Sequence, residues 1–153
     1  MSIRIIPFKS ELAASFKELN LAWLTEYFYV EPKDADLLDK CQEMIIDQGG
    51  QIFFAAKEKI ILGCFSLLPL NSNSFELGKM AVKTGYQGQR IGHLLLEHAI
   101  KYCKSKEISS LVLYSNTLLQ PAIHLYKKFG FEEIPMEVPP PYERSNIKMT
   151  LIL

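Results

Sequence analysis

The sequence has no excess of charge of either sign. Its 153 residues include 17 Lys plus Arg and 17 Asp plus Glu, so the formal net charge is zero. A nucleic-acid-binding protein usually carries a basic excess or a basic stripe. The densest basic cluster here, Lys101, Lys104 and Lys106, lies on the polar side of a predicted helix. We therefore expect no nucleic-acid partner and no strong attraction to polyanions.

The sequence also lacks cysteine pairs, metal-ligand spacings and long apolar runs. Cys41, Cys64 and Cys103 form no CxxC pair, and the three histidines show no HxxxH spacing, so we predict no metal site. No apolar run approaches the roughly 20 residues of a membrane span, and residues 1–9 contain no apolar signal core. These absences predict a cytoplasmic protein with reduced thiols and no membrane partner.

The apolar pattern predicts a single domain over residues 1–153 that contains about seven strands and four helices. Strands are expected over 3–6, 51–56, 59–68, 75–82, 110–114, 131–134 and 147–153; helices are expected from Ser10 to before Pro32, over 36–46, from Arg90 to Lys104 and over 121–129. Three successive strands with short connections run antiparallel, and a later strand–helix–strand crossover adds a parallel pair. The predicted fold class is therefore α+β in α/β/α layers, with a mixed, mostly antiparallel twisted sheet and helices on both faces.

The segment of residues 80–92 runs from a strand through a glycine-containing loop into a helix. The first turn of a helix has unpaired N–H groups and a partial positive charge, which suit a phosphate group. Gly88 and Gly92 allow a close approach to the backbone, although a simple tight turn would have the same residues. The loop lacks the Gly-Lys-Ser/Thr of a nucleotide P-loop and the complete glycine pattern of a dinucleotide fingerprint.

The loop Gln87-Gly88-Gln89-Arg90-Ile91-Gly92 resembles the acetyl-coenzyme A loop of the GNAT superfamily of N-acetyltransferases, which reads Gln/Arg-x-x-Gly-x-Gly/Ala. The first and last positions match, and Arg90 stands where the family has its middle glycine. The resemblance continues in Leu62-Gly63-Cys64, Glu76, Asn116, Ala122, Leu125-Tyr126 and Phe129-Gly130-Phe131. It implies a GNAT fold and the transfer of an acetyl group from acetyl-coenzyme A to a primary amine by direct attack in a ternary complex.

The resemblance also implies which residues bind the cosubstrate. They are Met80, Ala81, Val82, Gln87, Gly88, Gln89, Arg90, Ile91, Gly92, His93 and Asn116. Backbone N–H groups near Met80 and Val82 would hold the thioester carbonyl and the pantetheine. Asn116 would either bond the pantetheine or serve as a turn residue. Arg90 would either turn its guanidinium to a phosphate or face the solvent.

Two side chains are the candidate catalytic groups. Glu76 interrupts an apolar strand, and the resemblance implies a general base at this position; the alternative is a solvated strand glutamate. Tyr126 lies on the apolar face of the last helix, and the resemblance implies an acid that faces the coenzyme A sulfur. The alternative is a core tyrosine whose hydroxyl is hydrogen-bonded within the protein.

The acceptor is not identified by the sequence. A small-molecule amine is favoured over a histone-like protein tail. The sequence does not decide whether the protein forms a homodimer. Tyr27 and Tyr29 would line an acceptor pocket or belong to the core, and Tyr142, Glu143 and Arg144 would shape that pocket or form a surface loop. The alternative function is a module that binds acyl-coenzyme A without turnover, which would need neither Glu76 nor Tyr126.

Overall fold

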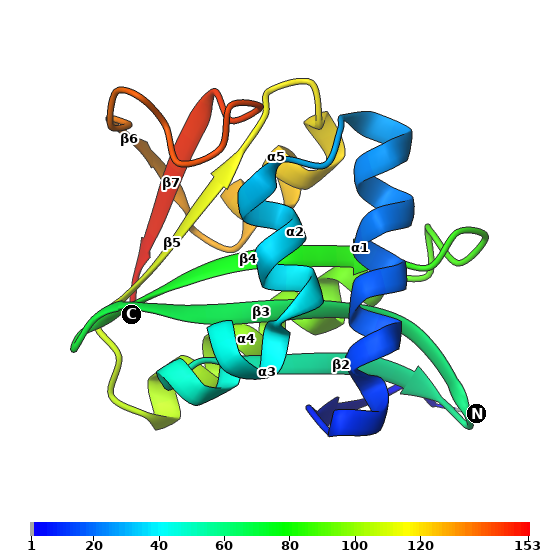
Figure 1. The fold of residues 1–153 in the computed structure, drawn as a ribbon. Coiled ribbons are helices and arrows are strands. Elements are labelled where there is room, and N and C mark those ends of the chain that lie inside the picture. The colour runs from blue at the N-terminus through cyan, green and yellow to red at the C-terminus, as the bar shows by residue number, and fades with distance from the viewer. Residues whose placement is uncertain (1) are drawn as a thin grey trace.

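A seven-stranded sheet forms the centre of the computed structural model, which describes residues 2–153 (Figure 1). Its strands are β1 (Arg4–Pro7), β2 (Gln51–Lys57), β3 (Ile60–Asn71), β4 (Ser74–Val82), β5 (Ser110–Ser115), β6 (Glu132–Ile134) and β7 (Ile147–Ile152). Their order is β1-β2-β3-β4-β5-β7-β6. The pair β4–β5 is parallel and the other neighbouring pairs are antiparallel, which confirms the predicted mixed sheet.

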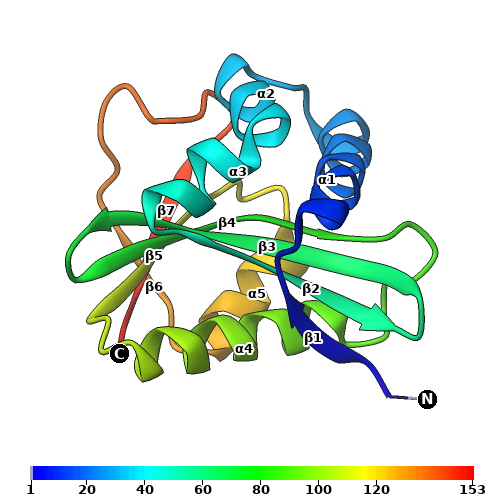
Figure 2. The ribbon, with the colours of Figure 1, turned by 60° about the horizontal axis from the view of Figure 1, so that its bottom comes forward.

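Helices cover both faces of this sheet, and an apolar core lies under each layer (Figure 2). One face carries α1 (Ala13–Tyr27), α2 (Pro32–Asp39) and α3 (Cys41–Met44). The other face carries α4 (Ile91–Ser105) and α5 (Gln120–Lys128). Short 3-10 turns precede α1 and follow α3, at Ser10–Leu12 and Ile46–Gln48. None of the helices in residues 2–153 has the length and apolar character needed to cross a bilayer.

The helix predicted over 36–46 is wrong in its extent. The structure has two helices here, and α2 begins at Pro32, which the sequence pattern treats as a breaker. Proline is well suited to the first turn of a helix, because its missing N–H would have no partner there. A capping box between Glu31 and Asp34 stabilises the same helix end. The backbone of Lys40, with φ −125° and ψ 42°, then separates α2 from α3.

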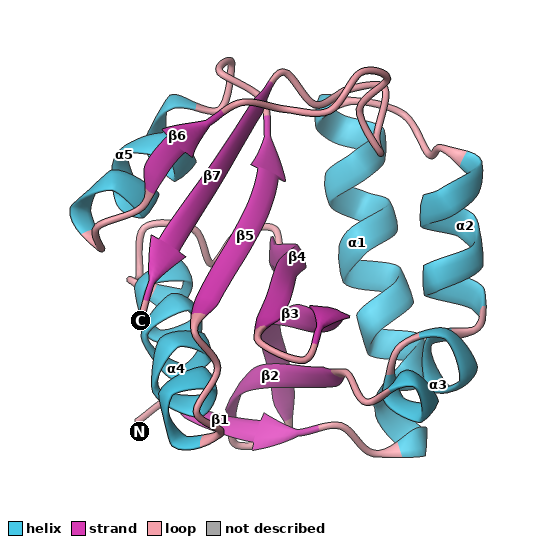
Figure 3. Cartoon of the chain, turned by 90° about the vertical axis from the view of Figure 1, so that its left-hand side faces the viewer, coloured by secondary structure: helices cyan, strands magenta, loops and turns pink. Residues whose placement is uncertain are grey.

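The feature that positions the site is a separation of β4 from β5. The two strands pair only from Ser74 to Glu76, opposite Ser110 to Val112, and beyond these residues they diverge (Figure 3). Within β4 the pairing with β3 also shifts, from Gly78 opposite Ser66 to Ala81 opposite Cys64. This leaves two β4 residues opposite one β3 residue, which is a β-bulge. The bulge and the divergence expose backbone groups of β4 that a regular sheet would pair.

Candidate functional site

A cavity of about 570 Å³ occupies the space between the diverging strands. Its wall is built from α1, the second half of β4, the loop before α4, the end of β5 and the first turns of α5. Ten of the eleven predicted cosubstrate residues line it: Met80, Ala81, Val82, Gln87, Gly88, Arg90, Ile91, Gly92, His93 and Asn116. Gln89 is exposed and does not line the cavity. Predicted residues from three separate elements thus face one space.

The start of α4 forms one end of this cavity. No side chain of residues 2–153 caps the helix, so the N–H groups of its first turn are available to an anion. Gly88 has a φ of +83° and Arg90 a φ of +63°, both in the left-handed region. This conformation explains why the GNAT loop that this segment resembles has glycine at the position of Arg90. A residue with a Cβ atom is strained there by about 1–2 kcal/mol.

Two polar side chains of the predicted cosubstrate site also have partners within the protein. The Gln87 Oε1 atom accepts a hydrogen bond from the Gly85 N–H at 2.9 Å and so stabilises the loop. The Asn116 Nδ2 atom donates to the Arg144 carbonyl at 2.8 Å, and its Oδ1 atom accepts from the Leu118 N–H at 2.8 Å. The turn role of Asn116 is therefore present in the structure, and its bond to pantetheine stays a prediction.

Tyr126 lines the cavity from α5. Its ring lies 5.8 Å from that of Phe131, and its hydroxyl makes no hydrogen bond with any side chain or backbone group of residues 2–153. Burial raises the pKa of Tyr126 to about 12, because the phenolate is poorly solvated there. The hydroxyl therefore stays protonated at neutral pH and can donate a hydrogen bond or a proton into the cavity.

Glu76 lies on β4 just outside the cavity wall, with 7% of its surface exposed. Burial raises the pKa of its carboxyl above the usual value, in spite of the nearby positive charges of Lys33 and Lys79. Gly78, two residues further along, does line the cavity. A Cβ atom on Gly78 would lie 3.6 Å from Glu76 Oε2. The missing side chain of Gly78 therefore leaves space between the carboxylate and the cavity.

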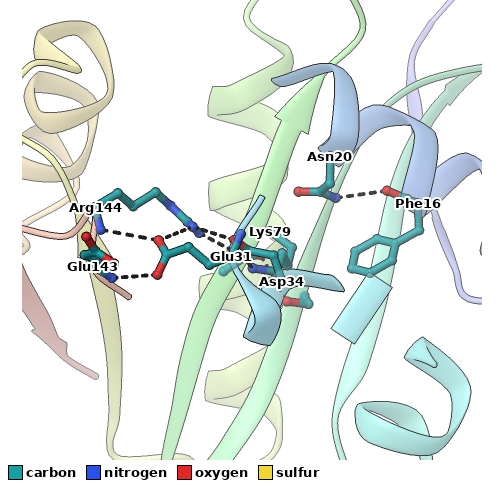
Figure 4. Close-up of polar contacts among 9 residues, drawn as sticks. Phe16, Asn20, Glu31, Asp34, Lys79, Glu143 and Arg144 are labelled. Carbon is teal, nitrogen blue, oxygen red and sulfur yellow. Dashed lines mark hydrogen bonds and ion pairs between the residues drawn. The ribbon is translucent and has the colours of Figure 1, made fainter. Parts of the chain in front are cut away.

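Beside the cavity lies a buried network of charges (Figure 4), and two of its members, Lys79 and Arg144, line the cavity wall. Asp34 is fully buried, forms an ion pair with Lys79 and accepts bonds from Arg144 at 2.6 and 3.0 Å. Glu31 accepts from the backbone N–H of Glu143 at 2.7 Å and from Arg144 Nη1 at 2.9 Å. The network joins α2, the β4 bulge and the loop after β6. Glu143 and Arg144 of this network were named from the sequence, but Glu31, Asp34 and Lys79 were missed. The capping-box spacing of Glu31 and Asp34 is a signal that could have found two of these three.

The loop after β6 is held against this network by an aromatic ring. Tyr142 is buried, and the cationic groups of Lys33, Lys79 and Arg144 lie 4.5–4.6 Å from its ring centroid. Such contacts are favourable because the ring face is electronegative. Arg144 lines the cavity, whereas Glu143 is exposed. The loop thus contributes to the cavity wall through Arg144 rather than lying free on the surface.

Aromatic residues of α1 and its C-terminal end form the remaining wall. Trp23, Tyr27 and Phe28 line the cavity, and the Trp23 ring lies within 5.8 Å of both neighbouring rings. Tyr29 does not line it. No cluster of three His, Cys, Asp or Glu side chains suited to a metal ion occurs among residues 2–153. The polar groups that line or adjoin the cavity include backbone amides, the Glu76 carboxylate, the Tyr126 phenol and the cations of Lys79 and Arg144.

Comparison with known proteins shows the family. Residues 16–131 match the family model described as the acetyltransferase (GNAT) family. The chain belongs to the GNAT acetyltransferase family. This GNAT chain is similar to a GNAT family acetyltransferase from Staphylococcus aureus Mu50, with 25% identity, a TM-score of 0.86 and coverage of 97% of this chain and 98% of the other. The predicted GNAT fold is thereby confirmed.

Two further relatives bear on the ligands. The PaiA N-acetyltransferase from Thermoplasma acidophilum, solved in complex with coenzyme A, aligns over the full length of both chains with 22% identity and a TM-score of 0.79. A Bacillus subtilis protein assigned as a ribosomal protein bS18-alanine N-acetyltransferase is 37% identical over 57 residues, which are 37% of this chain and 38% of the relative. The chain spans less than half the length of the curated relatives that it matches.

Proposed function

We propose that this GNAT chain transfers an acetyl group from acetyl-coenzyme A to the primary amine of an acceptor, by direct attack in a ternary complex. The observation that carries the proposal is the single cavity between β4 and β5, which brings together the open start of α4, the β4 bulge and Tyr126. Catalysis of this kind needs the thioester and the amine held together in a reactive geometry.

The cavity wall offers a suitable partner to each part of coenzyme A. The pyrophosphate would lie at the first turn of α4, where N–H groups and the helix dipole favour an anion. The arm would lie along residues 77–82 of β4, which are not paired with β5. The bulge at Lys79 and Met80 would then direct backbone N–H groups toward the thioester carbonyl, where negative charge develops. The coenzyme A complex of the PaiA relative supports coenzyme A as the ligand.

Glu76 would accept the proton that the amine must lose. An alkyl ammonium group has a pKa of about 10.4 and is no nucleophile until it is deprotonated. Because Glu76 is separated from the cavity by the space over Gly78, the proton would pass through a water molecule in that space. The raised pKa of Glu76 makes it a better base than an exposed glutamate.

Tyr126 would supply a proton at the end of the reaction. The new N–C bond forms as the C–S bond breaks, and the electron pair of the latter leaves on sulfur. The Tyr126 hydroxyl would protonate this thiolate, since it is protonated at neutral pH and faces the cavity without a partner in residues 2–153. The acceptor nitrogen loses two protons in all. Glu76 would pass the first, from the ammonium group, to solvent and would then take the second, which leaves the nitrogen as the N–C bond forms. Transfer of that second proton through solvent to Tyr126 restores the starting state.

A thiol-release assay tests the proposal. The protein is incubated with acetyl-coenzyme A and four amines: tryptamine, spermidine, a peptide with N-terminal alanine and a peptide with an internal lysine. The aromatic wall favours tryptamine among the small amines, and the assignment of the Bacillus relative motivates the alanine peptide. We expect thiol release in step with an acetylated product detected by mass spectrometry, with a small-molecule amine preferred.

The controls separate the proposal from its alternative. Glu76→Gln and Tyr126→Phe should reduce turnover while leaving the affinity for coenzyme A, measured by calorimetry, close to that of the wild type. Tight coenzyme A binding without turnover of any amine would favour a module that binds acyl-coenzyme A. Failure to bind coenzyme A at all would refute both functions.

A further inference from the structure

Asn20 on α1 is a buried polar residue whose role is not explained by the catalytic scheme above. It is 1% exposed and lines the cavity. Its Nδ2 atom donates hydrogen bonds to the Phe16 carbonyl at 3.0 Å and to the Cys64 sulfur at 3.4 Å. A carbonyl oxygen can only accept, so the amide nitrogen must face Phe16. The amide oxygen consequently points away from Phe16 (Figure 4).

The Asn20 Oδ1 atom has no hydrogen-bond donor among residues 2–153, yet it is not sealed from the cavity. An amide oxygen that loses water without gaining a partner costs about 1–3 kcal/mol. A leucine of similar size would avoid that cost and would pack well in the core under α1. The oxygen is therefore suited to a donor that arrives in the cavity.

The contacts of Asn20 show which part of the cavity its Oδ1 atom is near. Its partner Cys64 lies on β3 opposite Ala81, and the Cys64 sulfur lies 3.5 Å from the Lys79 carbonyl. Asn20 is thus placed over the β4 bulge, where the thioester carbonyl is expected. Lys79 and Arg144 line the cavity as well, and the acceptor would approach the thioester carbonyl from this part of it.

We propose that Asn20 Oδ1 accepts a hydrogen bond from the attacking nitrogen of the acceptor and makes the site selective for primary amines. This inference rests on the proposed acetyl transfer. A neutral primary amine has two N–H bonds and one lone pair. The lone pair attacks the thioester carbon, one N–H proton goes through water to Glu76, and the other N–H is held by Asn20.

An N-methyl amine cannot satisfy both partners. It has a single N–H, which must be given up to Glu76, so its amide product has none left for Asn20. A neutral amide oxygen orients the nitrogen without competing for its proton, because it is not a base at neutral pH. Asn20 would accordingly favour the primary amine in the transition state as well as in the bound complex.

Two substitutions separate this role from a purely structural one. Asn20→Thr can keep a bond to the Phe16 carbonyl, as Thr25 does with the Leu21 carbonyl at 2.8 Å in the same helix, but it removes the oxygen from the cavity. Asn20→Leu removes both. Cys64→Ala is the matched control, because it removes a structural partner of the Asn20 nitrogen and leaves the oxygen in place.

The experiment compares the ratio of kcat/KM for a primary amine to that for its N-methyl form. The pairs are tryptamine with N-methyltryptamine, and an N-terminal alanine peptide with its N-methylalanine form. We expect both Asn20 variants to lower this ratio by about fivefold to tenfold, as for one lost hydrogen bond, and Cys64→Ala to leave it unchanged. A purely structural role would lower both rates together and leave the ratio as in the wild type, which would overturn the proposal.

A binding measurement keeps the result independent of turnover. The same amines are titrated by calorimetry into wild type, Asn20→Thr and Cys64→Ala, each saturated with coenzyme A. Weaker binding of the primary amine to Asn20→Thr alone supports the proposal even if no variant turns over, in which case the acetyl-transfer function fails by itself. Equal affinities in all three proteins, or no amine binding to the coenzyme A-saturated wild type, would refute the role of Asn20.

Discussion

Replacing Asp34 with asparagine should destabilise the protein far more than removing an exposed carboxylate from the same helix. Asp34 is fully buried and compensates two cations, Lys79 and Arg144. Arg144 keeps a second carboxylate partner in Glu31, at 2.9 Å. Lys79 has no other carboxylate within ion-pair distance in residues 2–153. The substitution therefore leaves one buried ammonium group uncompensated.

The magnitude follows from burial. Removing one partner of a buried ion pair costs about 3–5 kcal/mol. For a chain of this size about 1 kcal/mol lowers Tm by about 2–4 °C, so Asp34→Asn should lower Tm by roughly 6–20 °C. Asp39→Asn is the matched control. Asp39 also lies on α2 and pairs with Lys17 at 2.7 Å, but these side chains are 52% and 46% exposed. Its loss should cost about 0–1 kcal/mol.

The assay is urea unfolding of wild type and both variants, with circular dichroism as the readout. A second substitution tests the cause: Lys79→Met in the Asp34→Asn background should recover part of the loss, because it removes the uncompensated charge. A cost of Asp34→Asn no larger than that of Asp39→Asn would refute the reasoning. So would a double variant that is as unstable as the sum of the two single ones.

The pH dependence provides an independent check on the same carboxylate. Burial by itself would raise the pKa of Asp34, but bonds from Arg144 and the charge and bond of Lys79 outweigh it and lower the pKa below the ordinary 3.8. As the pH falls, the Asp34 carboxyl therefore takes up its proton at a higher pH in the unfolded chain than in the folded protein. The stabilisation is complete above pH 3.8 and is lost as the pH falls through the lower folded-state pKa. Asp34→Asn should show none of this loss.

The other predictions concern the reaction site. Tyr126→Phe should lower kcat by about tenfold or more with unchanged coenzyme A affinity in calorimetry; wild-type turnover would remove its role as an acid. Glu76→Gln should lower kcat/KM by about 100-fold to 10,000-fold. Because burial raises the pKa of Glu76, wild-type stability relative to this variant should fall as pH rises above 4.5 through the folded-state pKa, and urea unfolding that shows the opposite slope would contradict the burial argument. Gly78→Ala fits without a steric clash but fills the water space, so stability should persist while kcat falls at least tenfold; unchanged kcat would exclude the water path. Arg90→Gly relieves a φ of +63° and should weaken coenzyme A binding if the guanidinium contacts a phosphate; equal or tighter binding in calorimetry would exclude that contact.

The order of the strands and the fold class could be predicted from the sequence alone, although the structure has two helices where the sequence predicted one over 36–46. The spacing of apolar residues distinguishes strands from helices, because the side chains on one buried face follow a different period in each. This spacing can be recognised within a short stretch of sequence. Tyr126 could be placed on an apolar helix face for the same reason. The loop from Gln87 to Gly92 was identified by its position between a strand and a helix and by its resemblance to the GNAT coenzyme A loop. They are local patterns in which residue type and spacing carry the information. Their chemical roles in this chain remain predictions.

The tertiary structure alone decided how distant segments meet. The bulge at Lys79, the separation of β4 from β5 and the contact of Asp34 with Arg144, which is 110 residues away in the sequence, have no local signal. The free oxygen of Asn20 is a further example, since it depends on Phe16 and Cys64 taking the amide nitrogen. Strand register and buried ion pairs result from the packing of whole elements. For this reason the candidate residues of the site could be named from the sequence, and the fold determined which of them face the same cavity.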